Sequence, residues 1–508
     1  MKMSLRPYAT VGVALVGAAV FVVSPLSPPS QHFQRHAVHL TGDTVGLVIG
    51  GSGTPIPGAS YVEAANDLYI QASDPGTIYP GVLAKGLFTP EGLYPLDGTN
   101  VLRLNYPAGS DGFPAQTTSV GQGMTILDDN IKAQLADGNA VTVFGYSQSS
   151  TIASLEMEQL DPSGTPSKLP ISFVLIGDPS NPNGGLLERF NGFESSTGSS
   201  YSLPLNIPSM GMAFDGATPA DDFHTSIYTI EYDGFADFPR YPIDFLADLN
   251  AFLGIDKLHG TYLNGGADGN GPTPEQIKDA TLLPGSEDSK VDPCHSCLTN
   301  YYMIDETAPL VSLLPKSMQE LLGPDLTYLI NLGYGADNLG YSDTSASTPT
   351  PFGLFPDVSM GTIMKNLVAD TELGWKDYSS GTDPYASSGS AADAPNSVVT
   401  TISDTLNGAS TTGAPTFTSI VDALSGAVSA TNGGLAGLSD ISNALSTSLP
   451  AYELDLFTTN LEHGNLLDAF FMPMAAGTAL DTLADGFELE IVMNTLSGVE
   501  ASFTDAGL

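Results

Sequence analysis

Basic side chains are scarce in this chain of 508 residues. Lys and Arg together number 15 against 56 Asp and Glu, which gives a formal net charge of −41. A surface of this sign repels polyanions, so the balance argues against nucleic acid as a partner and against electrostatic docking on anionic lipid. The acidic residues are scattered, as on a solubilising surface. A neutral or apolar substrate therefore fits this composition better than a polyanion.

Cysteine is almost absent. The only two are Cys294 and Cys297, with His295 between them in the stretch CHSC. A structural zinc site takes four ligands, and no second pair is present to complete one. The sequence therefore predicts no metal site, and it predicts no cofactor because no dinucleotide fingerprint is met. If the chain is exported, we expect a local disulfide between the two cysteines.

Long apolar runs are also lacking, with one short exception near the N-terminus. Residues 11–23 form an uninterrupted run of apolar residues and glycine, after Lys2 and Arg6 and before a group of prolines. The run is too short for an ordinary membrane-spanning helix but has the length of an export signal. No clear cleavage site precedes the prolines, so an uncleaved anchor is the alternative. We expect residues 1–40 to be a signal peptide or membrane anchor with a spacer, and the protein to be exported to the cell envelope or beyond.

Buried-strand signals alternate with helical spacing over most of the chain. Such alternation predicts an α/β fold with a mainly parallel sheet and flanking helices, here across residues 41–340. The predicted strands are Val45–Ile49, Val101–Tyr106, Val141–Phe144, Ile171–Ile176 and Ser226–Tyr232, and the predicted helices are Tyr61–Ile70, Val120–Ala136 and Ile243–Leu253.

Composition changes after this region. Residues 341–415 are rich in Ser, Thr, Gly and Pro and are predicted to form loops or a linker, with a short helix at 358–368. Residues 416–508 regain helical apolar spacing and are predicted to form a helical C-terminal region. No catalytic motif is evident there.

The most informative stretch is VTVFGYSQSSTIAS at residues 141–154. A short apolar strand leads into Gly145-Tyr146-Ser147-Gln148-Ser149, and a helical run follows. This is the layout of a nucleophile elbow, in which a tight turn between small residues exposes the serine hydroxyl. A plain Gly/Ser turn is the alternative. The context favours Ser147 as a nucleophile.

A serine nucleophile needs donors for the oxyanion that forms on its substrate. The Gln148 N–H, at the predicted helix start, is one candidate. The loop GGSGTP at residues 50–55, directly after the first predicted strand, is the source of a second donor, with Ser52, Gly53 and Thr54 as candidates.

The base must be a histidine that follows the serine in the chain, as the order of this type of triad requires. Three of the seven histidines precede Ser147, and His224 stands just before a strand, at the wrong end of the sheet. His295 lies between the cysteines, and His463 follows a low-complexity stretch. His259 lies in a loop after a predicted helix, so we assign it as the base.

The acid should follow a strand of the same sheet. Asp233 and Asp237 both come after the strand at 226–232. Asp237 stands farther from the strand end, beyond a glycine turn, and is the preferred acid. Asp233 and then Asp178 are the alternatives, and each also suits a turn or cap.

Several sequence blocks together resemble the PE-PPE domain of mycobacterial proteins, a cutinase-like branch of the α/β-hydrolase fold. The resemblance covers roughly residues 40–360 and rests on GGSGTPIPG (50–58), GYSQSS (145–150), IGDPSNPNGGLLERF (176–190), EYDGFADFPRYPIDFLADLNA (231–251), HGTY (259–262), NYYMI (300–304) and LINLGYGAD (329–337). It implies an α/β-hydrolase-like fold, with Ser147 as nucleophile, Asp237 as acid and His259 as base. Many relatives carry an N-terminal helical domain where this chain has the apolar run.

The resemblance also implies a reaction class. We expect a serine hydrolase that cleaves esters of acyl chains, with a lipid or glycolipid ester as substrate and membrane association through the N-terminal segment. One alternative is an acyltransferase that builds envelope glycolipids. A second is a non-catalytic envelope protein that binds lipid.

Overall fold

The computed structural model describes residues 43–505 apart from 73–80, 97, 99, 268–269, 291, 295–296 and 381–416. The predicted signal or anchor at residues 1–40, most of the predicted linker and His295 therefore lie outside the described residues. Within the described part of the chain, no helix combines the length and hydropathy that crossing a membrane would require.

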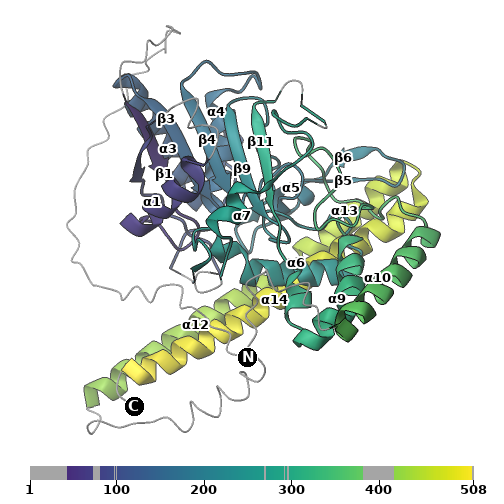
Figure 1. Ribbon diagram of the computed structural model, residues 1–508. Helices are drawn as coiled ribbons and strands as arrows, with labels where there is room; N and C mark the ends of the chain where they lie inside the picture. Colours follow the sequence, from purple (N-terminus) through teal and green to yellow (C-terminus); the bar gives the residue numbers. More distant parts are fainter. Residues whose placement is uncertain are drawn as a thin grey trace.

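A seven-stranded sheet forms the centre of the molecule (Figure 1). Its strand order is β10-β11-β9-β4-β3-β1-β2, and only the edge strand β10 pairs antiparallel. This confirms the predicted mainly parallel α/β sheet. The strands are β1 (Thr44–Val48), β2 (Leu83–Gly86), β3 (Ala140–Tyr146), β4 (Ile171–Ile176), β9 (His224–Ile230), β10 (Thr281–Leu282) and β11 (Thr299–Ile304).

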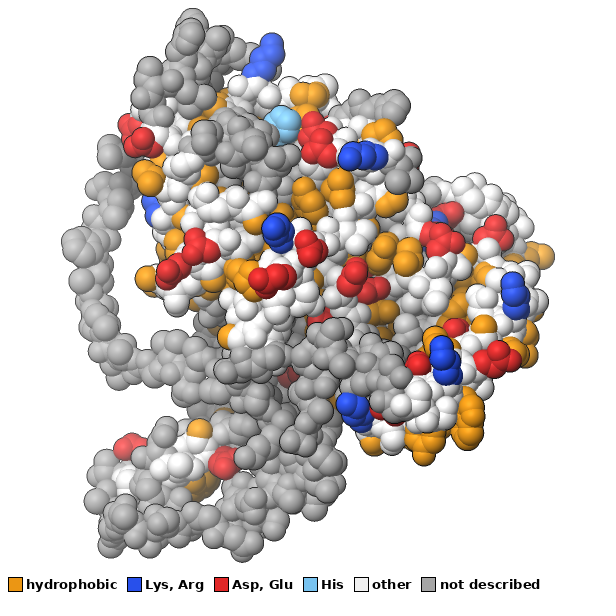
Figure 2. Space-filling view, viewed as in Figure 1, with side chains coloured by type: hydrophobic (Ala, Val, Ile, Leu, Met, Phe, Trp, Pro, Cys, Tyr) orange, Lys and Arg blue, Asp and Glu red, His pale blue; other side chains and the backbone are white. Residues whose placement is uncertain are grey.

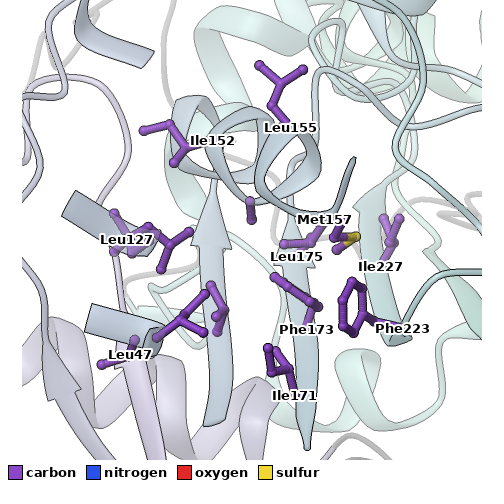
Figure 3. Packing of buried hydrophobic residues seen from close by; sticks show 14 of the residues in the cluster. Leu47, Leu127, Ile152, Leu155, Met157, Ile171, Phe173, Leu175, Phe223 and Ile227 are labelled. Carbon is purple, nitrogen blue, oxygen red and sulfur yellow. The ribbon is translucent and has the colours of Figure 1, made fainter. Parts of the chain in front are cut away.

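Apolar side chains from both faces of the sheet are buried, which is why its central strands read as continuous apolar runs. On one face, Phe173 and Leu175 of β4 pack with Ile152 of α4 (Gln148–Leu160) and Leu127 of α3 (Ser119–Ala136), as Figure 3 shows. The opposite face is covered by α1 (Ala59–Ala65), η1 (Asn66–Ile70) and α7 (Pro274–Lys278), where Tyr69 and Ile277 join a second buried cluster. The predicted helices at 61–70 and 120–136 are confirmed.

The predicted strand at 101–106 is wrong. Its backbone makes one isolated bridge at Arg103, and its other groups pair elsewhere: the carbonyls of Arg103 and Leu104 accept from the first residues of α3, and the Asn105 N–H donates to Gly211. The edge position next to β1 belongs to β2 instead. That strand is short and largely exposed, so it carries little apolar signal. The strands β10 and β11 were likewise not predicted as strands.

The C-terminal region is helical, as predicted. It consists of α12 (Phe417–Ser446), α13 (Ser448–Glu462) and α14 (Leu466–Asp505), and α12 and α14 run side by side away from the sheet (Figure 1). The helix α10 (Met360–Ser380) is longer than the predicted one at 358–368 and packs on α9 (Lys316–Asn331). The remaining elements are α5 (Leu186–Arg189), β5 (Gly192–Glu194), β6 (Ser200–Ser202), β7 (Asn206–Ile207), β8 (Met212–Ala213), α6 (Phe245–Lys257), η2 (His259–Thr261) and α8 (Pro309–Ser312).

Acidic side chains are spread over the face seen in Figure 2, with fewer Lys and Arg among them. Others are buried. Burial raises the pKa of Glu156, which lies beside Asp128, to about 9, that of Glu188 to about 7 and that of Glu231 to about 7. The molecule therefore holds carboxyl groups that lose their protons at higher pH than an exposed carboxyl group does.

The helix α6 touches the backbone that leaves β9, and glycine makes this contact possible. A Cβ on Gly254 would lie 1.8 Å from the Tyr232 carbonyl oxygen, and one on Gly234 would lie 2.3 Å from the Ala251 carbonyl oxygen. Both positions face backbone, which cannot swing aside as a side chain can. This contact fixes α6, and the loop after it, against the end of β9.

We predict that Gly254→Ala lowers the free energy of unfolding by roughly 1–3 kcal/mol, as expected for overpacking. Gly433→Ala in α12 is the matched control, because a Cβ there meets nothing within 4 Å. It should raise stability by up to about 1 kcal/mol through helix propensity. Urea unfolding followed by circular dichroism measures both, and equal effects would contradict the predicted contact.

We also predict that stability falls as pH rises. Glu156, Glu188 and Glu231 have folded pKa values above the ordinary value of 4.5, so the folded state binds more protons than the unfolded state above pH 4.5. The stabilisation is complete below the unfolded pKa and is lost as pH rises through the folded values of about 7 to 9. The urea midpoint should therefore be lower at pH 8.5 than at pH 6, and Glu156→Gln should reduce this difference. A midpoint that rises over this range would refute the assignment.

Candidate active site

Ser147 stands at the turn between the central strand β3 and the helix α4. Its backbone has φ 59° and ψ −121°, a conformation that a residue with a side chain rarely adopts. A Cβ on Gly145 would lie 2.8 Å from the Ser149 carbonyl oxygen, so glycine is needed before the serine. The Ser149 hydroxyl accepts from the Tyr146 N–H at 2.8 Å and donates to the Tyr146 carbonyl at 3.1 Å. The structure thus has the strand, sharp turn and helix that the sequence predicts.

His259 lies directly against this serine. It begins η2, just after α6, and its Nε2 is 2.7 Å from Ser147 Oγ. Its Nδ1 lies 2.8 Å and 3.0 Å from the two carboxylate oxygens of Asp233. A carboxylate accepts at Nδ1–H, which leaves Nε2 unprotonated and able to take the serine proton. The three side chains form a continuous line of hydrogen bonds.

The preferred acid from the sequence, Asp237, is not the partner of His259. Its Oδ2 accepts from the Tyr232 N–H at 2.9 Å, and burial raises its pKa well above the usual range. The chain forms a tight turn directly after β9. The Asp233 N–H donates to the Ile230 carbonyl, and the Asp237 N–H donates to the Asp233 carbonyl. This turn directs Asp233 at the histidine and places Asp237 behind it. The number of residues between the strand end and an aspartate therefore does not identify which aspartate faces the histidine.

The third candidate acid, Asp178, is also engaged elsewhere. Its Oδ2 accepts from the Thr218 hydroxyl at 2.6 Å and its Oδ1 from the Ser180 N–H at 3.0 Å. Burial raises its pKa to about 6. Asp178 therefore holds the loop after β4.

Two further residues, Tyr262 and Gly177, lie against the acid and the base, and sequence reasoning assigned no role to either of them. The Tyr262 hydroxyl donates to Asp233 Oδ2 at 2.8 Å and accepts from the Ile230 N–H at 2.9 Å. Gly177 has φ 54°, and a Cβ on it would lie 3.2 Å from His259 Cε1 and 3.0 Å from Tyr262 Cε2. Tyr262 follows His259 by three residues in the block HGTY, which was the available signal.

The predicted oxyanion loop lies beside the serine, but only part of it is available. A Cβ on Gly51 would be 3.4 Å from Ser147 Cβ, so the loop touches the turn. The Gln148 side chain donates to Ser52 Oγ at 2.9 Å and thereby ties the loop to α4. The Gly53 N–H donates to the Glu91 carbonyl and the Thr54 N–H to Gly51, both at 2.9 Å. Gly53 and Thr54 are therefore wrong as backbone donors, and Ser52 and Gln148 are the remaining candidates.

The predicted disulfide is absent from the structure. The Cys297 N–H donates to Cys294 Sγ at 3.1 Å, while the Cys297 thiol lies 3.6 Å from the Gly285 carbonyl oxygen. Burial raises the pKa of this thiol to about 12. Across the described residues, no group of three or more His, Cys, Asp or Glu side chains is arranged to hold a metal ion.

Comparisons with known proteins identify similar chains. A family model described as the PE-PPE domain matches residues 80–335. The uncharacterized PPE family protein PPE28 of Mycobacterium tuberculosis is 39% identical over 478 residues, which cover 89% of this chain and 65% of that protein. Esterase PE16 of the same organism is 38% identical over 325 residues, covering 62% of this chain and 52% of that protein. This chain thus spans about half to two thirds of the length of these relatives.

Among solved structures, a cutinase-like protein from Cryptococcus sp. is similar. It is 16% identical, and the match covers 38% of this chain and 79% of that protein, with a TM-score of 0.23. A likeness at this level says nothing further about the site.

We predict that Asp233→Asn and Asp237→Asn separate the two carboxylates. An amide at position 233 disturbs the histidine tautomer, which in the serine protease triad lowers kcat by about 10⁴. Asparagine at position 237 still accepts from the Tyr232 N–H and resembles the protonated acid. Labelling of Ser147 by a fluorophosphonate probe should therefore slow by at least about 10³ in Asp233→Asn and by only a few-fold in Asp237→Asn. The reverse order would make Asp237 the acid.

Proposed function

Because the chain belongs to the PE-PPE domain family, we propose that it is a serine esterase that cleaves esters of acyl chains. The observation that carries the proposal is the 2.7 Å contact of Ser147 Oγ with His259 Nε2, made at a turn where Ser147 has φ 59°. Strained backbone of this kind clusters at active sites, and at Ser147 it coincides with the histidine contact. The similarity to the protein named Esterase PE16 supports the same reaction class.

The geometry suits covalent catalysis. Ser147 Oγ attacks the ester carbonyl carbon while His259 Nε2 takes the hydroxyl proton. His259 then gives this proton to the departing alcohol, which leaves an acyl group on Ser147. Asp233 orients the ring and stabilises its protonated form. In the second half a water attacks the acyl group and His259 takes one of its protons. His259 then returns this proton to Ser147 Oγ as the bond to the acyl group breaks and the acid product leaves.

The negative charge that forms on the carbonyl oxygen needs donors beside Ser147. The Gln148 N–H lies at the N-terminus of α4, where backbone N–H groups and the helix dipole favour an anion. The Ser52 hydroxyl accepts a hydrogen bond from the Gln148 side chain, which keeps Ser52 next to Gln148. These two residues are the oxyanion donors of the proposal.

A second candidate is acyl transfer, in which an alcohol such as a sugar hydroxyl replaces water. The His259 side chain is only 12% exposed, and Phe235 packs against its ring. Limited access of water favours an alcohol acceptor that binds in its place. Adding a disaccharide to the ester assay separates the reactions, because transfer yields an acylated sugar where hydrolysis yields free acid.

The cellular location of the protein is part of the proposal. The proposed export and association with the cell envelope rest on the predicted signal or anchor at residues 1–40, which lies outside the described residues. A lipid or glycolipid ester as natural substrate is part of the same proposal.

We predict that Ser147→Ala and His259→Ala each lower kcat for p-nitrophenyl ester hydrolysis by at least about 10³, since the members of such a triad act as a unit. Ser163→Ala, in an exposed turn beyond α4, is the matched control and should match the wild type. Circular dichroism checks that each variant is folded. A wild type that neither hydrolyses esters nor reacts with a fluorophosphonate would leave the non-catalytic, lipid-binding alternative.

A further inference from the structure

A ring from the C-terminal helix α14 reaches the neighbourhood of His259. The Phe235 ring meets the His259 ring edge to face, with 4.7 Å between centroids. Phe487 of α14 stacks on Phe235 at 6.4 Å with 21° between the planes. Phe487 also meets Phe252 of α6 edge to face at 5.9 Å. All three phenylalanines are only partly buried, so they present apolar surface beside the site.

The approach of α14 to α6 is close and specific. A Cβ on Gly486 would lie 2.2 Å from Cε2 of Phe252, so a larger residue there would force the Phe252 ring to shift. The neighbouring Phe487 is thereby brought over Phe235. Ile255 of α6 and Met212 of the β7–β8 hairpin are partly buried and pack, like Phe487, against the same buried cluster.

The partner helix α12 is attached through Asp440 to the segment that contains Tyr94 and to Ser209. The Tyr94 hydroxyl donates to Asp440 Oδ2 at 2.5 Å, and the Ser209 hydroxyl donates to the Asp440 carbonyl at 2.8 Å. Gly92, two residues before Tyr94, accepts from the Gln148 side chain at 3.1 Å. The helix pair therefore contacts both the loop next to the oxyanion donors and the loop that carries the acid.

The chemistry of this surface selects an uncharged group. No Lys or Arg follows Lys376 in the sequence, so the helix pair offers no cation to a carboxylate or phosphate. Phenylalanine rings and aliphatic side chains gain free energy by covering hydrocarbon. The surface suits a hydrocarbon chain.

We propose that Phe487 of α14, behind Phe235, forms the wall on which the acyl chain of the ester lies, and that it sets the preferred acyl length. The inference rests on the proposed esterase function. It makes α14 part of the substrate site, although this helix lies outside the residues matched by the family model. Phe487 lies one ring beyond Phe235 as counted from His259, so the proposal expects a long acyl chain to gain more from Phe487 than an acetyl group does.

The test is the ratio of kcat/KM for p-nitrophenyl octanoate to that for the acetate, measured on the full chain. In Phe487→Ala we expect this ratio to fall about tenfold, the lower end of what lost hydrocarbon contacts change in a binding site. Phe487→Leu, which keeps an apolar side chain, should stay within about threefold of the wild-type ratio. Leu496→Ala is the matched control, because Leu496 is exposed on the same helix, and its ratio should equal that of the wild type.

Thermal unfolding and fluorophosphonate labelling of each variant separate specificity from folding. Equal losses with both esters, or an unchanged ratio in Phe487→Ala, would overturn the role of Phe487 while leaving the esterase proposal intact. A wild type that is inert toward both esters and unlabelled would overturn the proposed function and this inference together. A reduced ratio with normal labelling supports both.

Discussion

The backbone turn at Ser147 is the constraint on which the site depends. A conformation of this kind costs on the order of 1–3 kcal/mol and persists only where the surroundings determine it. Here β3 is paired on both sides, by β1 and β4, and every residue of it is buried. The Ser149 hydroxyl then closes the turn through both polar groups of the Tyr146 backbone. A rigid central strand and a hydroxyl clamp together hold the serine where His259 can reach it.

The Asp233 carboxylate is not the only group that fixes the position of His259. The Tyr146 hydroxyl donates to the His259 carbonyl, so the residue before the serine also fixes the backbone of the base. Tyr262 bonds Asp233 with its hydroxyl, and its own carbonyl accepts from Tyr69. Serine, acid and base are thus linked by tyrosines that lie between the sheet and the loops. We regard Tyr262 as a positioning residue, since it acts through Asp233.

Much of this arrangement follows from the sequence, and the errors have local causes. The elbow and the parallel sheet follow from strong patterns, namely a strand with a glycine turn and strands alternating with helices. His259 follows from the chain order of the triad and from the small number of histidines after Ser147. The acid does not, because Asp233 and Asp237 lie on one tight turn and only its hydrogen bonds decide which carboxylate faces the histidine. The same holds for Gly53, whose N–H is taken by Glu91, a residue remote in sequence. The segment at 101–106 has the composition of a strand, yet its backbone is paired by α3 and Gly211.

The residues matched by the family model contain only part of the proposed substrate site. Residues 80–335 contain the serine, its acid and its base, but neither the loop around Ser52 nor the helix α14. The proposed reacting groups thus come from the matched region, while one proposed oxyanion donor and the proposed acyl-chain wall at Phe487 come from outside it. Hydrogen bonds within the matched region position Ser147, His259 and Asp233. In the proposal, Phe487 only adds hydrocarbon contact with the substrate. Under the proposals above, a C-terminal helix pair of different sequence would change the preferred acyl chain without disturbing the contact between Ser147 and His259.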